Sequence, residues 1–206
     1  MTAPVKKPKT ARGQRTLRNL LDAAALEFGS KGYHDASVAG ITSKAGIAQG
    51  TFYIYFSSKE EIFRELVLDL GRTLREELSA NVAGAPDRLT AERQGLGYFI
   101  QFVRDHPHLY RIVMEAQYVD ESAFRKYFTD FASAYSVKLQ RALVQGEIRS
   151  GPTDERAWAL LGISLFLGLR YGLWGHERPV DEVVDAVMDL VEHGLRQPPE
   201  QGVARD

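Results

Sequence analysis

Cysteine is absent from this chain of 206 residues, which excludes disulfide bonds, thiolate catalysis and zinc sites built on cysteine. Long hydrophobic runs are also missing. The longest mostly apolar, uncharged stretch, Ala157 to Leu169, is shorter than the roughly 20 residues that a membrane span needs. The first ten residues hold three lysines and two prolines with no apolar core behind them, unlike a signal peptide. We therefore expect a cytoplasmic protein with no membrane partner.

Strand patterns are hard to find, whereas apolar residues recur at helical spacing along most of the chain. Hydrophobic residues make up 44% of the sequence, which is enough for a packed core. Ser58 and Glu61 have the spacing of a capping box. The expected helices are a first ending near Gly32, a second capped by Ser37, a third from Ala48 to about Tyr55, a fourth from Ser58 to about Ala80, and five more at about 87–105, 107–117, 121–147, 154–174 and 180–196. The sequence therefore predicts an all-α fold of about nine helices.

The net charge of −1 hides an uneven distribution of charge along the chain. Residues 1–64 hold ten Lys and Arg against five acids, so they carry +5, and the remaining 16 basic and 22 acidic residues carry −6. A basic surface attracts DNA whatever its sequence. An ordinary solvated face with a basic tail gives the same count, so charge alone leaves both interpretations open.

The most informative stretch lies inside this basic part. A short helix ends at Lys44, Ala45 and Gly46 supply a turn, and a second short helix rich in hydroxyl groups follows. This order is typical of the helix-turn-helix, which lays its second helix in the major groove of DNA.

The segment Gln-Gly-Thr-Phe-Tyr-Ile-Tyr-Phe at 49–56, followed by Ser-Ser-Lys-Glu-Glu at 57–61, closely resembles the DNA-binding domain of the TetR family of bacterial transcriptional regulators. The resemblance runs from about Arg12 to Leu70, roughly a third of the chain. It implies an N-terminal three-helix DNA-binding domain and a C-terminal helical domain that binds a ligand and dimerises. We expect a disordered basic tail at 1–11, the DNA-binding domain at 12–72 with its helix-turn-helix at about 37–56, the larger domain at 73–197, and a tail at 198–206.

Reading bases and anchoring to phosphates require different side chains. A glutamine can pair with an adenine edge, a threonine methyl can pack on a thymine methyl, and tyrosine and serine hydroxyls can donate to phosphates. The resemblance implies DNA contacts for Gln49, Thr51, Tyr53, Tyr55 and Lys59. For Ser37, capping of its own helix is the alternative to a DNA contact. For Gly50, the alternative to close approach of the DNA is a glycine that only relieves packing. The predicted DNA-contacting residues are Ser37, Ser43, Lys44, Gln49, Gly50, Thr51, Tyr53, Tyr55 and Lys59.

Lys59 occupies the first turn of the expected fourth helix, where a cation opposes the helix dipole at a cost of about 0.3–1 kcal/mol. A bound phosphate would explain it, and a solvent-facing lysine is the alternative. Two residues depart from the family pattern. Gly40 replaces an acid that often completes a capping box with Ser37, and Ala48 replaces a capping serine. Each change should weaken the motif by about 0.5–1 kcal/mol.

The larger domain has no convincing catalytic or metal-binding set. His106 and His108 flank Pro107, with Glu115 further on, which is a weak metal signal. Aromatic residues recur across several helices, either as a packed core or as the walls of a small-molecule pocket. TetR-like proteins typically bind an apolar or amphipathic effector here, and no cofactor is expected. The predicted pocket residues are Phe99, Phe102, Tyr110, Arg111, Met114, Gln117, Tyr118, Phe131, Tyr135, Phe166 and Trp174.

The last two helices offer apolar surface for pairing. Residues 154–174 are apolar nearly all round, and Gly168 and Gly172 allow another helix to come close. Residues 180–196 place Val183, Val184 and other valines on one face. These features suit a two-fold four-helix interface as in this family, although both helices can instead be satisfied within one chain.

We therefore expect a homodimeric regulator, and most simply a repressor that a small effector releases from a palindromic operator. An effector-independent DNA-binding regulator is the alternative within the same fold. An all-helical enzyme or lipid carrier is the alternative from another class.

Overall fold

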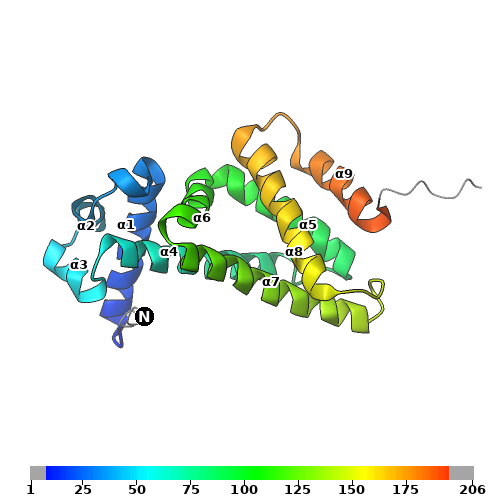
Figure 1. Cartoon of the computed structure of the whole chain (residues 1–206), viewed down its shortest axis with the longest axis horizontal. Coiled ribbons are helices and arrows are strands. Elements are labelled where there is room, and N and C mark those ends of the chain that lie inside the picture. The colour runs from blue at the N-terminus through cyan, green and yellow to red at the C-terminus, as the bar shows by residue number, and fades with distance from the viewer. Residues whose placement is uncertain (1–7, 195–206) are drawn as a thin grey trace, which may run out of the picture.

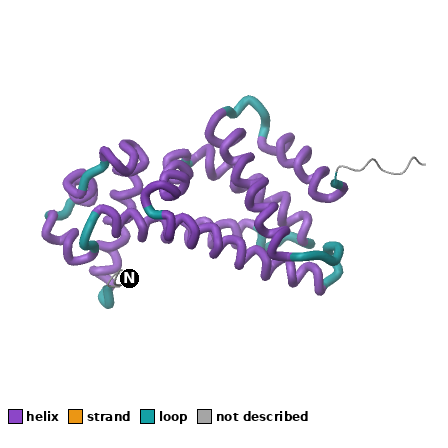
Figure 2. The backbone as a smooth tube through the Cα atoms, in the orientation of Figure 1, coloured by secondary structure: helices purple, strands orange, loops and turns teal. Residues whose placement is uncertain are grey.

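The computed structural model describes residues 8–194, which fold into nine α-helices and one short π-helical segment with no strand (Figures 1 and 2). The predicted all-α class is confirmed. The elements are α1 (Ala11–Asp35), α2 (Val38–Ala45), α3 (Gln49–Tyr55), α4 (Lys59–Asn81), α5 (Arg88–Asp105), α6 (Pro107–Val119), α7 (Glu121–Val144), α8 (Thr153–Leu167), the π-helical segment η1 (Gly168–Trp174) and α9 (Val180–His193). The expected tails lie outside the described residues, except for residues 8–10, which lead into α1, and Ala11, which is the first residue of α1 and not part of a tail.

The first helix begins and ends at sites that its sequence specifies. The Thr10 hydroxyl accepts a hydrogen bond from the Gly13 N–H at 3.1 Å and so caps the first turn. Gly32 has a φ of +75°, which glycine adopts without steric cost. The regular helix therefore breaks at Gly32, as the sequence predicts, and Tyr33–Asp35 turn away from its axis.

The first three helices pack on one apolar core that continues into α4, α6 and α7. Leu20, Phe28, Ile41, Phe52 and Phe56 are each at most 1% exposed. The two phenylalanines of this set in the Gln49–Phe56 stretch occupy the core as their spacing predicts. Burial of large apolar side chains at about 1.5–3 kcal/mol each holds these short helices in place.

The fourth helix connects the two parts of the molecule (Figure 1). Only one of the two hydrogen bonds of the predicted capping box is present at its N-terminus. The Ser58 hydroxyl accepts from the Glu61 N–H at 3.2 Å, but the Glu61 carboxylate accepts from the Ser57 N–H at 2.5 Å instead of the Ser58 N–H. Because α4 runs unbroken to Asn81, the domain boundary that we place near residue 72 lies inside a helix instead of at a linker.

Two ion pairs fix α4 against its neighbours. Asp69 is 2% exposed and accepts from Arg18 of α1 at 2.6 Å, and Arg72 pairs with its other oxygen. Arg64 pairs with Asp120, at the junction of α6 and α7, at 2.5 Å. A displacement of α4 would therefore disturb its ion pairs with both α1 and the α6–α7 junction.

The valine face of α9 is covered within the chain. Val183, Val184 and Met188 are buried against Leu96 and Ile100 of α5. The expectation that this face meets a partner subunit is wrong, because α5 already supplies the apolar surface that the valines need. Leu190, which is 40% exposed, lies outside that contact.

The two glycines of η1 face α5 of the same chain. A Cβ on Gly168 would lie 2.7 Å from Phe99 Cε1, and one on Gly172 would lie 2.7 Å from Val103 Cγ1. The close helix approach that the glycines predict is confirmed, and the helix that approaches is α5 of this chain.

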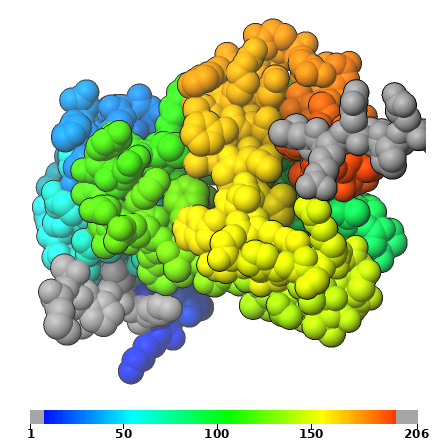
Figure 3. Space-filling view, turned by 45° about the vertical axis from the view of Figure 1, so that its right-hand side comes forward, coloured from blue at the N-terminus to red at the C-terminus, as the bar shows by residue number. Residues whose placement is uncertain are grey.

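A line of large apolar side chains on α8 and η1 faces solvent. Trp158, Phe166 and Trp174 are 45%, 69% and 69% exposed. In the space-filling view α8 crosses the visible face of the molecule without a covering helix (Figure 3). Among the described residues, Thr153–Trp174 is the one helical stretch long and apolar enough to span a membrane by length and composition, although core helices pass the same test. An uncovered group of large apolar side chains of this kind is typical of an interaction surface.

Candidate DNA-binding surface and effector cavity

The helix-turn-helix is closed by a cap and a left-handed glycine. The Ser37 hydroxyl accepts from the Gly40 N–H at 3.0 Å and starts α2. Gly46 ends α2 with a φ of +67°, which a residue with a side chain rarely adopts. The capping role of Ser37 is therefore present, and its exposed position leaves a phosphate contact as a further prediction.

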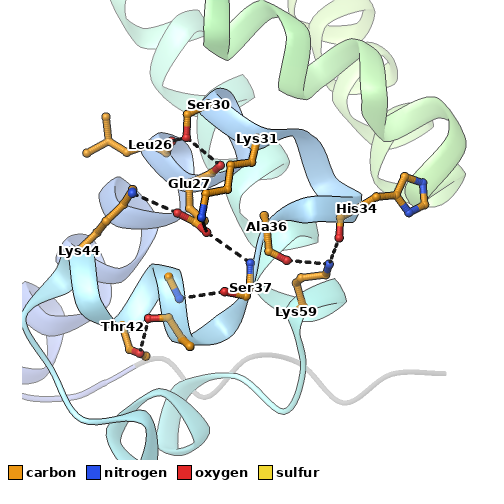
Figure 4. A network of polar contacts seen from close by, with 12 residues as sticks. Leu26, Glu27, Ser30, Lys31, His34, Ala36, Ser37, Thr42, Lys44 and Lys59 are labelled. Carbon is orange, nitrogen blue, oxygen red and sulfur yellow. Dashed lines mark hydrogen bonds and ion pairs between the residues drawn. The ribbon is translucent and has the colours of Figure 1, made fainter.

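A buried carboxylate joins α1 to α2 (Figure 4). Glu27 is 0% exposed, and its oxygens lie 2.8 Å from Lys31 Nζ and 3.1 Å from Lys44 Nζ. Burial alone would raise the pKa of Glu27, but hydrogen bonds from Lys31, Lys44 and the Ser37 N–H outweigh it and lower the pKa. The carboxylate is therefore ionised at neutral pH and holds Lys44 toward α1.

The missing acid at position 40 is replaced from another helix. The Ser37 N–H donates to Glu27 Oε1 at 3.4 Å, which is the bond that a capping-box acid within α2 would make. A Cβ on Gly40 would lie 2.1 Å from the same oxygen. The expectation that Gly40 weakens the motif is thus wrong, because glycine at this position makes room for the carboxylate of Glu27.

The recognition helix α3 presents a mixed face to solvent. Tyr53 is 57% exposed, and Gln49 and Gly50 are also exposed, whereas Thr51 is half-buried. Ile54, which is 70% exposed, is an additional candidate that the sequence interpretation missed. An apolar residue between two tyrosines in this short helix was the available signal, because a methyl group can contact thymine.

The ends of α3 differ in how they are held. Ala48 caps the helix without a side-chain hydrogen bond, as its departure from the family pattern predicts. Tyr55 is half-buried and packs on the core, with its hydroxyl near Gly13 in the first turn of α1. Tyr55 therefore faces α1 more than the open side of α3. Ser43 is exposed at the C-terminal end of α2.

Lys59 has a structural role that the sequence interpretation missed. Its ammonium donates to the carbonyls of Tyr33 at 2.7 Å, His34 at 3.2 Å and Ala36 at 2.9 Å, and it lies 4.4 Å from the centre of the Tyr33 ring. A cation is stabilised by the carbonyl end of a helix. The end of α1 therefore accounts for this cation without a phosphate, and neither the solvent-facing alternative nor a free phosphate anchor describes it.

The larger part of the molecule encloses a cavity of about 180 Å³ between α4, α5, α6, α7, α8 and α9. Its walls are mainly leucine, valine and aromatic side chains. Six of the predicted pocket residues line it, namely Phe99, Phe102, Tyr110, Met114, Phe131 and Tyr135. A cavity is what distinguishes a ligand pocket from a filled aromatic core.

Five predicted pocket residues lie elsewhere, and their assignment is wrong. Arg111, Gln117, Tyr118, Phe166 and Trp174 are all exposed. Arg111, Gln117 and Tyr118 project from the outer side of α6, and the other two belong to the uncovered face of α8 and η1. The polar groups of the cavity are instead Arg75, Ser79, Arg88, Glu92, Lys138 and the hydroxyls of its tyrosines and Ser164. The i, i+4 spacing of Arg88 and Glu92 was a signal for their pairing but not for their burial.

The histidines of the α5–α6 junction take part in packing. A Cβ on Gly29 would lie 2.8 Å from His108 Cβ, so α1 and α6 meet closely there. Both oxygens of Glu115 accept from the Tyr33 N–H, at 2.9 and 3.0 Å. Within residues 8–194, no group of three potential metal ligands lies together.

The comparisons with known proteins agree with this geometry. Residues 20–66 match the model for bacterial regulatory proteins of the tetR family. The transcriptional regulator YdgC of Bacillus subtilis is 47% identical over 66 residues, which are 32% of this chain and 34% of that protein. The transcriptional repressor KstR2 of Rhodococcus jostii is 27% identical over 194 residues, which are 90% of this chain and 93% of that protein.

Solved structures share the whole fold. The fatty acid degradation regulator FadR of Bacillus halodurans has a TM-score of 0.77 at 19% identity and covers 93% of this chain and 100% of its own. FadR of Bacillus subtilis in complex with stearoyl-CoA has a TM-score of 0.70 at 18% identity over 87% of this chain and 99% of its own. With the exposed α3, its capped turn and its core phenylalanines in the expected arrangement, residues 20–66 match the DNA-binding domain of the TetR family of bacterial transcriptional regulators, and the whole chain shares the fold of these solved regulators.

Proposed function

We propose that this regulator is a homodimeric, cytoplasmic repressor that binds a palindromic operator and is released by a small apolar or amphipathic effector. The observation that carries the proposal is α6, which lines the cavity with one face and packs on α1 of the DNA-binding part with another. KstR2, a relative along nearly its whole length, is a repressor, which supports the sign of regulation.

The DNA-reading role belongs to the exposed side of α3. Gln49, Thr51 and Ile54 are the candidates for base contacts, and Tyr53 is the candidate for a phosphate contact. Ser37 and Ser43 lie at either end of α2, where their hydroxyls can reach the DNA backbone. Lys44 is exposed enough to add a positive charge while paired with Glu27.

The coupling runs through α6 and α4. Tyr110 and Met114 of α6 line the cavity, while His108 and Glu115 contact α1 at Gly29 and Tyr33. An effector that displaces α6 or α4 therefore changes the position of the helix-turn-helix. Effector and operator then weaken each other's binding by the same factor.

Dimerisation is proposed through residues 154–174, together with the outer side of α9. Trp158, Phe166 and Trp174 form an apolar line that a second copy can cover by two-fold symmetry. A dimer places two α3 helices on half-sites about one helical turn or more apart. This surface also favours a subunit interface over a membrane span for Thr153–Trp174, because Arg156 and Arg170 lie within that stretch.

An acyl chain is a reasonable occupant of the cavity. FadR of Bacillus subtilis, which has the same fold, binds stearoyl-CoA. An effector-independent regulator would have no use for a cavity of about 180 Å³, so this volume favours effector control over that alternative.

The test begins with selection of bound fragments from random DNA, which should yield a palindrome with two half-sites. On that operator, Gln49→Ala should lower the preference for the selected sequence by about 1–3 kcal/mol. Tyr53→Phe should weaken binding to all sequences alike, because it removes a phosphate contact. Gel shifts measure both effects.

Tyr118→Phe is the matched control, because it removes the hydroxyl of a tyrosine that is 87% exposed and belongs to α6 instead of α3. It should leave DNA binding unchanged. Undiminished sequence preference in Gln49→Ala and Thr51→Ala together would rule out α3 as the reading helix.

A further inference from the structure

The cavity has an apolar end and a charged end. α4 and α7 run in the same direction along it, since Gly71 meets Tyr127 and Ser79 accepts from Lys138 Nζ at 2.9 Å. The lining on α4 extends from Leu70 to Val82, about 18 Å at 1.5 Å per residue. α4 runs away from the DNA-binding part (Figure 1), so the lining residues extend from an end near α6 to an end remote from it.

Polar side chains gather at the remote end. Arg88 Nε lies 2.8 Å from Glu92 Oε1, and their side chains are only 11% and 9% exposed. The Tyr135 hydroxyl donates to the other oxygen of Glu92. Lys138 is half-buried beside them, with its ammonium 2.9 Å from the Ser79 hydroxyl.

The charges at this end do not balance. At this end the lining contains two cations, Arg88 and Lys138, against one carboxylate, Glu92. Burial lowers the pKa of Lys138, and the neighbouring charge of Arg88 lowers it further, while Glu92 opposes both. Guanidinium and ammonium groups offer five and three N–H donors, so Arg88 and Lys138 keep donors available after their recorded contacts.

Between that end and α6, Arg75 is the one charged side chain among the described residues of the lining, and its guanidinium lies over the Phe131 ring and 3.9 Å from Asp130. The hydroxyls of Tyr110 and Ser164 already donate to the backbone carbonyls of Leu165 and Leu160, both at 2.9 Å. The end near α6 is lined by Leu70, Leu109 and Val113. A polar group on a ligand would be costly there, whereas a hydrocarbon chain would not.

We propose that the cavity binds a single-chain anionic amphiphile, with its anionic head between Lys138 and Arg88 at the remote end and its alkyl chain directed toward α6. The assignment deepens the proposed function, on which it rests, by specifying the class and orientation of the effector. Ser79 and Ala134, which line the cavity beside Lys138, are exposed, so the head of the ligand lies at the end nearest to solvent. The chain end then lies against the side of α6 opposite α1, where chain length is read.

Calorimetric titration of the full-length protein with dodecanoate and with dodecan-1-ol tests the head-group site. Dodecanoate should bind at least about tenfold more tightly than the alcohol, because charge-assisted hydrogen bonds are the stronger class. In Lys138→Met this preference should fall toward onefold, with alcohol binding preserved. Arg141→Met, which removes an exposed cation from the same helix, is the control and should keep the preference.

Dodecanoyl-CoA is the third ligand, because a free fatty acid and a CoA thioester both carry an alkyl chain and an anionic head. The tighter binding of dodecanoate or of dodecanoyl-CoA shows whether the head is a carboxylate or a CoA group. Either result supports the assignment if Lys138→Met weakens that binding. Equal affinity for dodecanoate and the alcohol, a preference for dodecanoate that survives Lys138→Met, or binding of none of the three ligands would overturn the assignment.

Operator gel shifts in the same samples separate this assignment from the proposed function. If the alcohol binds as tightly as dodecanoate and both release DNA, effector control stands and the head-group site fails. If the anionic preference is found but no ligand releases DNA, the site stands and effector control fails. Leu109→Phe tests the orientation, because it should weaken hexadecanoate more than octanoate; an equal loss for both chains contradicts it.

Discussion

At the scale of single residues, the carboxylate of Glu27 organises the helix-turn-helix. A charge that is 0% exposed is costly unless it is paired and hydrogen-bonded. Here it is surrounded by Lys31, Lys44 and the Ser37 N–H, which come from α1, α2 and the cap between them. The geometry of the DNA-reading unit therefore depends on a residue that never faces DNA.

Gly40→Ala should destabilise the DNA-binding part by about 1–3 kcal/mol, because the new methyl would lie 2.1 Å from Glu27 Oε1. The Glu27 side chain would have to leave the Ser37 N–H and Lys44. Thermal unfolding monitored by circular dichroism measures the loss, and operator affinity should fall with it.

The control is Gly50→Ala, since no atom lies within 4 Å of the Cβ position of that exposed helical glycine. It should stabilise the free protein by about 0.5–1 kcal/mol. If DNA approaches closely there, operator affinity falls while stability rises. If the Gly40→Ala protein is as stable as the Gly50→Ala protein, glycine at position 40 is not needed to make room for the Glu27 carboxylate.

Lys59 illustrates what a sequence pattern leaves open at this scale. Its position in the first turn of α4 correctly marks a cation in an unfavourable place. The compensating partners are carbonyls of Tyr33, His34 and Ala36, more than 20 residues earlier in the chain. Spacing within a helix carries no information on which distant backbone atoms approach it.

At the scale of elements, the contact between η1 and α5 supports one wall of the cavity. Phe99 and Val103 of α5 line the cavity and also meet Gly168 and Gly172. Close packing without side chains on η1 therefore sets the position of the aromatic wall.

Gly172→Ala should lower the free energy of unfolding by about 1–3 kcal/mol, because its Cβ would lie 2.7 Å from Val103 Cγ1 and 3.2 Å from the Ile100 carbonyl oxygen. For a chain of this size, the melting temperature should drop by roughly 2–4 °C per kcal/mol. Gly97→Ala on α5 is the control, since its nearest neighbour, Val184 Cγ2, would be 3.7 Å away. Equal melting temperatures for the two variants would contradict a tight η1–α5 contact.

The helices themselves were predictable, because apolar spacing, caps and glycines act within a few residues. Which side of each helix faces the cavity and which faces solvent was less predictable. Phe99 and Phe131 line the cavity while Tyr118 and Phe166 face solvent, although all four are aromatic residues on helices. The charged end of the cavity escaped detection because Arg88 and Glu92 have the spacing of an ordinary surface pair.

At the scale of the whole molecule, the uncovered line on α8 and η1 sets the proposed assembly. The valine face of α9 was assigned to a partner from its periodicity, yet a periodic apolar face says only that it is covered, not by which chain. In this chain α5 covers it, and Trp158, Phe166 and Trp174 remain for a second copy.

Phe166→Glu should convert the dimer to a monomer, because a charge placed in a desolvated interface is strongly unfavourable. Light scattering coupled to size-exclusion chromatography reads the mass, expected as twice 23.1 kDa for the unaltered protein. Operator affinity should fall steeply, since two linked half-site contacts become independent. Tyr118→Glu, at a site 87% exposed on α6, should leave the mass unchanged. If the Phe166→Glu protein is still a dimer, the interface does not include Phe166.

The three carbonyls that hold the Lys59 ammonium have a consequence for engineering. Because the start of α4 is hydrogen-bonded to the end of α1, helices α1–α3 and the first turn of α4 should move as one rigid unit. A chimera that joins these helices to another regulator should therefore have its junction beyond Lys59. A junction at the Ser57–Ser58 loop would separate α1–α3 from Lys59, which binds the carbonyls at the end of α1.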